Sequence, residues 1–239
     1  MSRTARALLA WGLLAMLSPG AGAQAPAESA RLSVLAERIG KLHAQAASGT
    51  LPERGNRAIA EAVARFDREL AQVRPHAAPE AGEQLLLLKL LWSECRPWFV
   101  RAAGRETARR VVERVEELAW VAGRAARAVP ESPGVAALQG AALAQRLARL
   151  HLLRRGGPEE ALELAAAEER MKGLVARLRP AAAAHPQAVA ELELAENQLQ
   201  FLLLAAASRD EPRRLSIIAR SADHVTESLL RLARAQEGG

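Results

Sequence analysis

Apolar residues recur every three or four positions along most of the chain, which is the spacing a helix needs to bury one face in a bundle. Near 28–47 this face carries Leu32, Leu35, Ile39, Leu42 and Ala46. Near 211–235 it carries Ile218, Ala222, Val225, Leu229 and Leu232. The segments between them repeat the pattern, and proline or glycine separates most of them. The pattern predicts an all-α chain of eight helices.

The expected helices lie near residues 28–47, 59–73, 83–99, 105–125, 135–155, 158–179, 186–207 and 211–235. Pro97 falls inside the third of them and is expected to kink it or to end it early. The Pro-rich stretch at 130–134 divides the chain into two sets of four helices. Four helices are enough to close a bundle core.

The second set of helices repeats the first in sequence. Residues 35–43, LAERIGKLH, align without gaps on residues 143–151, LAQRLARLH. Two further pairs follow in the same order, Arg74-Pro75 with Arg179-Pro180 and Arg109-Arg110 with Arg213-Arg214. The chain is therefore predicted to be a duplication, with one four-helix up-down bundle in residues 24–130 and another in residues 131–239.

The first 23 residues match a secretory signal peptide. Arg3 and Arg6 precede an apolar run at 7–17, and the small residues at 21–23 provide a cleavage site after Ala23. A short N-terminal anchor helix is the alternative. No later stretch approaches 18 uninterrupted apolar residues, so we expect no transmembrane span in the mature protein, which would be periplasmic or secreted.

Composition narrows the class of protein further. Hydrophobic residues make up 50% and charged residues 25%, which excludes a disordered chain. The net charge of +6 comes with 3% aromatic residues and no aromatic-interleaved basic patch, so no nucleic-acid partner is expected. Cys95 is the only cysteine, which excludes an intrachain disulfide, a CxxCH haem site and a cysteine-based zinc site.

The repeated motif resembles the start of a known sensory domain. This PilJ/NarX-like domain is the N-terminal domain of type IV pilus methyl-accepting chemotaxis transducers, and it forms the periplasmic sensor of nitrate/nitrite histidine kinases. Its first helix reads roughly Q-R-M-L-S-Q-R-M-A-K-L-Y, which corresponds to residues 32–43 and 140–151. Residues 66–70 and Trp98-Phe99 fit the family's later helices. The resemblance implies a small-anion ligand and an inner-membrane receptor or sensor kinase as partner.

The chain departs from that family at one position of each repeat. In the nitrate sensors, an arginine five residues before the second arginine of the pattern holds the anion. Ser33 and Ala141 stand there, whereas the second arginine is kept as Arg38 and Arg146. The chain also shows no receptor or kinase segment after the helices, so it looks like a free-standing sensory domain.

Arg38 and Arg146 are therefore the candidate anion-binding residues. A guanidinium offers five donors in a planar fork that suits nitrate, carboxylate or phosphate. If the repeated helices face each other, the two arginines are expected to converge on a small anion. The alternative is that each pairs with a nearby glutamate. The neighbouring motif residues that would line the site are Glu37, Lys41, Gln145 and Arg149.

Other chemistry finds little support in the sequence. His43 and His151 occupy matching places but lack the Glu-x-x-His or His-x-x-x-His spacing of bundle metal sites, so no metal and no other cofactor is expected. No Walker loop, GxSxG or HExxH motif is present, and no enzymatic activity is expected. Trp92, Trp98 and Trp120 are expected to fill the core, with a ligand pocket as the alternative.

These observations predict an exported, non-catalytic sensory or ligand-binding protein that senses nitrate, nitrite or another small anion and acts with a membrane receptor. The alternative is a structural helical interaction protein of the cell envelope with no small-molecule ligand.

Overall fold

The computed structural model describes residues 21–51, 55–73, 79–100, 105–127, 132–154, 157–208 and 211–237. These residues form eight helices and no strand, which confirms the all-α prediction. The helices are α1 (Ala21–Ala47), α2 (Gly55–Gln72), α3 (Pro79–Phe99), α4 (Arg105–Arg127), α5 (Pro133–Leu153), α6 (Pro158–Ala182), α7 (Pro186–Ala207) and α8 (Glu211–Glu237). None of them is both long enough and apolar enough to span a membrane.

The predicted signal peptide lies outside the described residues except for its last three. Those three, Ala21–Ala23, form the start of α1. Cleavage after Ala23 would leave the rest of α1 in place, since the helix continues to Ala47.

Helix ends follow local chemistry. The Ser132 hydroxyl accepts a hydrogen bond from the Val135 amide at 3.2 Å, and Pro133 occupies the first turn of α5, as in a standard N-terminal cap. Pro97 lies inside α3, and the helix continues past it to Phe99, so the proline does not end the helix early as expected. In the same way, α6 continues past Pro180 to Ala182, because a proline near the end of a helix removes a single backbone donor and the helix retains its neighbouring hydrogen bonds.

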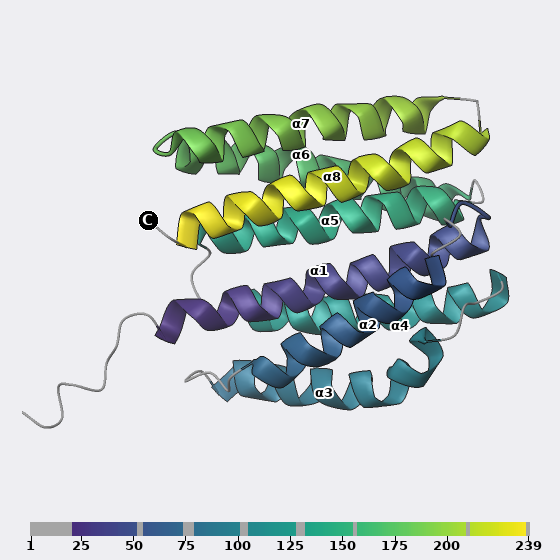
Figure 1. The fold of residues 1–239 in the computed structure, drawn as a ribbon, viewed down its shortest axis with the longest axis horizontal. Helices are drawn as coiled ribbons and strands as arrows, with labels where there is room; N and C mark the ends of the chain where they lie inside the picture. The colour runs from purple at the N-terminus through teal and green to yellow at the C-terminus, as the bar shows by residue number, and fades with distance from the viewer. Residues whose placement is uncertain are drawn as a thin grey trace, which may run out of the picture.

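The eight helices form two sets of four that meet along α1 and α5 (Figure 1). In the first set, α1 packs on α2 and α4, and α3 packs on α4. In the second set, α5 packs on α6 and α8, and α7 packs on α8. The two central helices run in the same direction, since Val34 shares a buried cluster with Ala141, and Ala44 shares one with Leu152 further along both helices.

The two sets bury corresponding positions. In α3 these are Ala81, Leu85, Leu88, Trp92 and Cys95, which match at a constant offset Ala188, Leu192, Ala195, Leu199 and Leu202 of α7. In α4 they are Ala108, Val111, Val115, Leu118, Ala122 and Ala125, which match Leu215, Ile218, Ala222, Val225, Leu229 and Leu232 of α8. In α2 they are Ile59, Ala62, Phe66, Leu70 and Val73, which match Leu164, Ala167, Met171, Val175 and Leu178 of α6.

One sequence correspondence does not follow this register. The buried positions pair Ala108 with Leu215, so Arg109-Arg110 corresponds to residues 216–217 and not to Arg213-Arg214. Two adjacent arginines are common in an arginine-rich chain, and buried positions report the packing register more directly than charged ones do.

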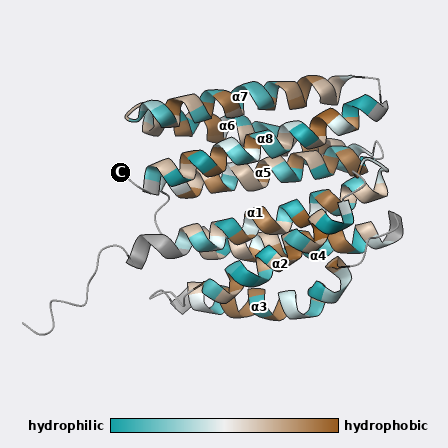
Figure 2. Cartoon of the chain, in the orientation of Figure 1, coloured by the Kyte–Doolittle hydropathy of each residue, from teal (hydrophilic) through white to brown (hydrophobic). Residues whose placement is uncertain are grey.

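The cores of the two sets differ in their largest side chains. In the first, Phe66 stacks on Trp92 with ring centroids 4.0 Å apart, and Trp92 lies 5.6 Å from Phe99. In the second, Met171 and Leu199 occupy the positions of Phe66 and Trp92. Hydrophobic and hydrophilic residues alternate around the helices, as expected of amphipathic helices that bury one face (Figure 2).

Candidate functional site

A layer of buried charged and amide side chains lies between the two sets of helices. Its central members are Glu37 and Lys41 of α1 and Gln145 and Arg149 of α5, all of them buried. Two acidic residues complete it at the edges, Glu116 of α4 and Asp223 of α8. We call these six residues the polar layer. Charges are rarely buried without partners, so their contacts are informative.

Arg149 binds two carboxylates from the other set of helices. Its Nε donates to Glu37 Oε2 at 3.1 Å, and its Nη1 donates to Glu116 Oε1 at 2.9 Å. Only 1% of its side chain is exposed, and its Nη2 has no hydrogen-bond partner among the described residues. Gly40 makes room for this side chain, because a Cβ there would lie 2.9 Å from Arg149 Cδ.

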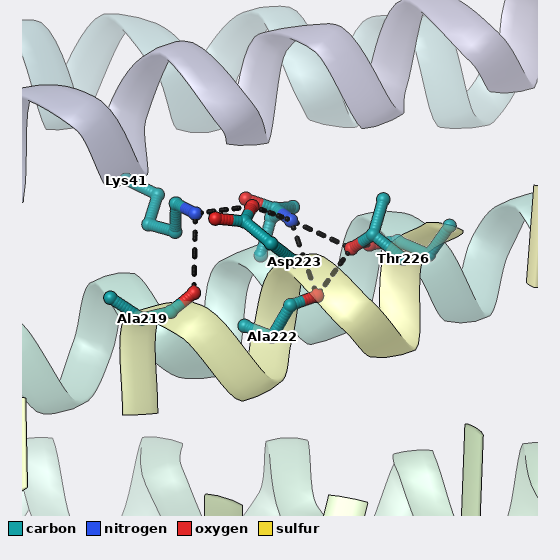
Figure 3. A network of polar contacts seen from close by, with 7 residues as sticks. Lys41, Ala219, Ala222, Asp223 and Thr226 are labelled. Atoms are coloured by element: carbon teal, nitrogen blue, oxygen red, sulfur yellow. Dashed lines mark hydrogen bonds and ion pairs between the residues drawn. The ribbon is translucent and has the colours of Figure 1, made fainter. Parts of the chain in front are cut away.

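Lys41 of α1 forms the second ion pair of the polar layer, with Asp223 of α8. Its Nζ donates to Asp223 Oδ1 at 2.5 Å and to the Ala219 carbonyl at 3.4 Å (Figure 3). Gln145 Nε2 donates to the same Asp223 oxygen at 3.2 Å and to Thr226 Oγ1 at 2.6 Å. Lys41 and Gln145, from different sets of helices, therefore share one carboxylate.

The two ion pairs occupy corresponding positions. In the register of the buried residues, Lys41 corresponds to Arg149, Glu37 to Gln145, and Glu116 to Asp223. Each set thus sends one cation from its first helix to an acid on the fourth helix of the other set. The residues are not identical, because a carboxylate on α1 is replaced by an amide on α5.

Burial shifts the pKa values in this layer. Burial raises the pKa of Glu37 above its ordinary value, although Arg149 opposes the shift. Burial lowers the pKa of Lys41, and Asp223 partly offsets that effect. Both shifts arise because burial disfavours the charged form of each group, and the cross-set ion pairs oppose this effect in part.

The structure separates the two arginines that were expected to converge. Arg38 is exposed on α1, and Arg146 Nη2 donates to Glu163 Oε1 of α6 at 2.6 Å. No contact joins Arg38 to Arg146 within the described part of the chain. The four neighbouring motif residues are instead the ones brought together, as the centre of the polar layer.

Arg146 lines a cleft between the two sets of helices. Its volume is about 390 Å³, within the range typical of small-molecule sites. Two further arginines, Arg170 and Arg177, line it from α6, and neither forms an ion pair with a described residue. We call this the arginine cleft. Its other lining residues are Ser33, Glu37, Glu116, Ala119, Trp120, Gly123, Gln139, Ala142, Leu143, Gly173 and Leu174.

Sequence reasoning identified only part of this cleft. It selected Arg146, and it considered a pocket role for Trp120, which is 55% exposed and lines the cleft. It missed Arg170 and Arg177, because nothing in their spacing distinguishes them from other exposed arginines on helices. Trp92 fills the core as expected, whereas Trp98 is 43% exposed.

The corresponding positions of the other set carry different side chains. Gly123 and Gly173, which leave the arginine cleft open, correspond to Leu230 and Arg68. Trp120 corresponds to Glu227, and Arg177 to Gln72. The arginine cleft therefore combines arginines, an indole and glycines, and the corresponding positions of the other set of helices do not.

A second, larger cavity of about 570 Å³ lies beyond the polar layer, toward the C-terminal ends of α1 and α5. Arg109, Arg149 and Arg154 line it together with Glu113, Glu116, Glu160 and Glu163. Its glutamates outnumber its arginines, whereas arginines outnumber glutamates in the arginine cleft, so it offers an anion less net attraction than the arginine cleft does.

The two matching histidines are buried near the same end. His43 Nε2 lies 3.1 Å from the Phe99 carbonyl oxygen, and burial lowers its pKa. Burial, together with Arg214 and Arg154, lowers the pKa of His151 to about 4. No cluster of three or more potential metal-ligating side chains is found within the described residues.

Comparisons of the chain with protein-family models, with curated proteins and with solved structures gave no match. The arguments for function therefore depend on the geometry of the site.

Proposed function

We propose that this chain is an exported, non-catalytic sensory or ligand-binding protein that binds a small anion in the arginine cleft. The observation that carries the proposal is the gathering of Arg146, Arg170 and Arg177 around one cavity, with two of the three lacking an ion-pair partner among the described residues. The acids that line the same cleft, Glu37 and Glu116, are both bound by Arg149, which reduces their repulsion of an anion.

We further propose that the chain arose by duplication of a PilJ/NarX-like four-helix domain. The repeated motif on α1 and α5 and the shared register of buried positions support this proposal. In that arrangement α1 and α5 take the places of the paired first helices of a sensor dimer. Ser33, at the position of the family's anion-binding arginine, lines the arginine cleft beside Arg146.

Anion binding is proposed to act on the helices through Arg146. A bound anion competes with Glu163 for this guanidinium, and so it weakens an ion pair that links α5 to α6. A shift of these helices against α1 is then the signal offered to a membrane receptor.

A thermal-shift screen tests the proposal. The mature protein is heated with nitrate, nitrite, sulfate, phosphate or simple carboxylates at millimolar concentration. An anion present at a hundredfold excess over its Kd stabilises the fold by about 2.7 kcal/mol. Arg146→Gln should remove most of that gain, whereas Arg38→Gln, at the corresponding exposed position, should retain it. Absence of a shift with every anion contradicts the proposal.

A second candidate function is supported by exposed apolar side chains on the outer helices. Leu86 and Leu90 of α3 are 62% and 55% exposed, and Phe201 and Leu204 of α7 are 57% and 68% exposed. Such residues are typical of interaction surfaces when they form a contiguous patch. A structural interaction protein of the envelope would show no anion-dependent shift, and its binding to an envelope component would weaken in a Phe201→Ser, Leu204→Ser variant.

A further inference from the structure

The arginine cleft is much larger than an inorganic anion. A nitrate ion is only slightly larger than a water molecule, whose share of liquid volume is about 30 Å³, so it would occupy a small part of the cleft's 390 Å³. Sites that bind small organic molecules usually bury most of the ligand surface. The size of the cleft therefore favours an organic anion.

The arginines are spread along the cleft. Arg170 and Arg177 are separated by two turns of α6, which places their Cα atoms about 10 Å apart along the helix axis. Arg146 approaches from α5 and is anchored on Glu163. A single carboxylate takes two parallel hydrogen bonds from one guanidinium. Arginines spaced along a cleft in this way suit a ligand with an anionic group at each end.

The wall between the arginines is largely apolar. Ala119, Ala142, Leu143 and Leu174 contribute small or aliphatic surface, and the Trp120 indole is more than half exposed. Arg124 lies over the same indole, 5.1 Å from the ring centroid, and keeps a positive charge beside it. The exposed ring offers a surface on which a flat apolar group can stack.

Uncharged hydrogen-bonding side chains are scarce in this wall. Ser33 and Gln139 are the two among the lining residues, and the Ser33 hydroxyl already donates to the Ala119 carbonyl at 3.2 Å. A sugar or other polyol would therefore find few side-chain partners for its hydroxyl groups in this cleft.

We infer that the ligand of the arginine cleft is an aromatic dicarboxylate, held by Arg170 and Arg177 at its ends and stacked on Trp120. This inference rests on the proposed anion-binding function and specifies its ligand class. Gly123 and Gly173 provide the space for the ring, and no Cβ contact would arise within 4 Å at Gly173.

Isothermal titration calorimetry of the full mature chain at low salt tests the inference. The probes are terephthalate, benzoate, adipate and nitrate, which separate the contribution of the ring from that of the second carboxylate. We expect terephthalate to bind at least tenfold more tightly than each of the other three. Arg170→Gln and Arg177→Gln should each weaken terephthalate binding at least tenfold, and Trp120→Leu should reduce its affinity to that of adipate.

Arg65→Gln is the matched control, because Arg65 corresponds to Arg170 on the other set of helices and does not line the arginine cleft. It should leave terephthalate binding unchanged, and circular dichroism should show that all variants remain folded. Nitrate binding as tight as that of terephthalate, with loss on Arg146→Gln, overturns the dicarboxylate inference and leaves the proposed function standing. Absence of binding by all four probes overturns both, and terephthalate binding unchanged in both glutamine variants overturns the placement of the ligand.

Discussion

At the scale of single residues, the most consequential side chain is Arg149. Arg149 lies between the two sets of helices. There it forms ion pairs with the buried Glu37 and with the partly exposed Glu116. Removal of one partner of a buried ion pair leaves the other charge buried without compensation, which typically costs about 3–5 kcal/mol.

We predict that Arg149→Met lowers the free energy of unfolding by about 3–5 kcal/mol in urea denaturation. Adding Glu37→Gln to this variant should recover part of the loss, because the uncompensated carboxylate is then gone. Arg179→Met is the control, since the Arg179 side chain is 67% exposed and its ion pair with Glu196 should contribute less than about 1 kcal/mol. A similar loss in both variants would argue against the polar layer as a stabilising feature.

A second residue-scale prediction concerns His151 and pH. Its pKa is about 4 in the folded chain and 6.5 for an unperturbed histidine, so between these values the unfolded state binds more protons. Stability is therefore lost as pH falls from about 7 to 4, by up to about 3 kcal/mol from this residue.

His151→Gln should flatten that part of the stability profile, whereas the exposed His224→Gln should leave it unchanged. Urea midpoints measured from pH 7 to pH 4 provide the comparison. A wild-type profile identical in slope to that of His151→Gln would show that the buried histidine does not titrate as stated.

The residues of the polar layer could be predicted only in part from the sequence. The gapless match of residues 35–43 with 143–151 identified Glu37, Lys41, Gln145 and Arg149, because the repeat itself marks them. It could not show that Arg38 points outward, since a shift of one residue on a helix turns the side chain by about 100°. Asp223 and Glu116 lie on other helices, and their role depends on tertiary packing.

At the scale of helices, glycines set how closely α5 approaches its neighbours. A Cβ on Gly140 would lie 2.8 Å from Leu174 Cδ2 and 2.9 Å from Leu229 Cδ1. At the corresponding position α1 carries Leu32, which is buried, so the two sets of helices fill this point of the packing with different side chains.

We predict that Gly140→Ala destabilises the chain by about 1–3 kcal/mol through overpacking, despite the higher helix propensity of alanine. Gly173→Ala is the matched control, because no atom lies within 4 Å of its added Cβ, and it should raise stability by about 1 kcal/mol. Thermal denaturation of the two variants measures both effects. Stabilisation by Gly140→Ala would mean that Leu174 and Leu229 repack freely.

The helices themselves follow closely from the apolar spacing and the prolines. The prediction for the seventh helix, 186–207, agrees with α7 at both ends, since His185-Pro186 starts it and Ser208 follows it. The expected end of the sixth helix at residue 179 falls three residues before the end of α6, because the helix continues past Pro180 to Ala182. Pairing of α1 with α5 could not be read from periodicity alone, because a bundle helix buries similar apolar stripes against any neighbour.

At the scale of the molecule, the tryptophans of the mature chain lie in one of the two sets of helices, so the two sets can be followed by different spectroscopic signals. Trp92, Trp98 and Trp120 all belong to the first set, and the second contains no tryptophan. In the mature chain, without Trp11 of the predicted signal peptide, tryptophan fluorescence therefore reports on α1–α4, whereas far-ultraviolet circular dichroism reports on all the helices. One cluster of buried side chains extends from α5–α8 onto Ala27, Ala30 and Val34 of α1.

We predict that both signals change in a single transition, and that Met171→Ala, in the second set, lowers the free energy of unfolding by about 2–5 kcal/mol and shifts both midpoints equally. The physical reason is that the first set cannot keep α1 packed once α5 unfolds. Leu162→Ala, at a residue 73% exposed, is the control and should shift neither signal. A fluorescence midpoint that does not respond to Met171→Ala would indicate two independently stable units.

Joining both sets of helices in one chain has a consequence for stoichiometry. A symmetric dimer must carry every substitution twice, and its subunits separate on dilution. In a single chain each set of helices can change its sequence independently. Leu230 therefore stands at the position that corresponds to Gly123, and Gln72 at the position that corresponds to Arg177. The effective concentration of one half around the other is fixed by the connection near residue 132 and does not fall with dilution. A saturation curve for such a molecule should be hyperbolic with one ligand per chain, without the site-to-site interactions of a receptor dimer.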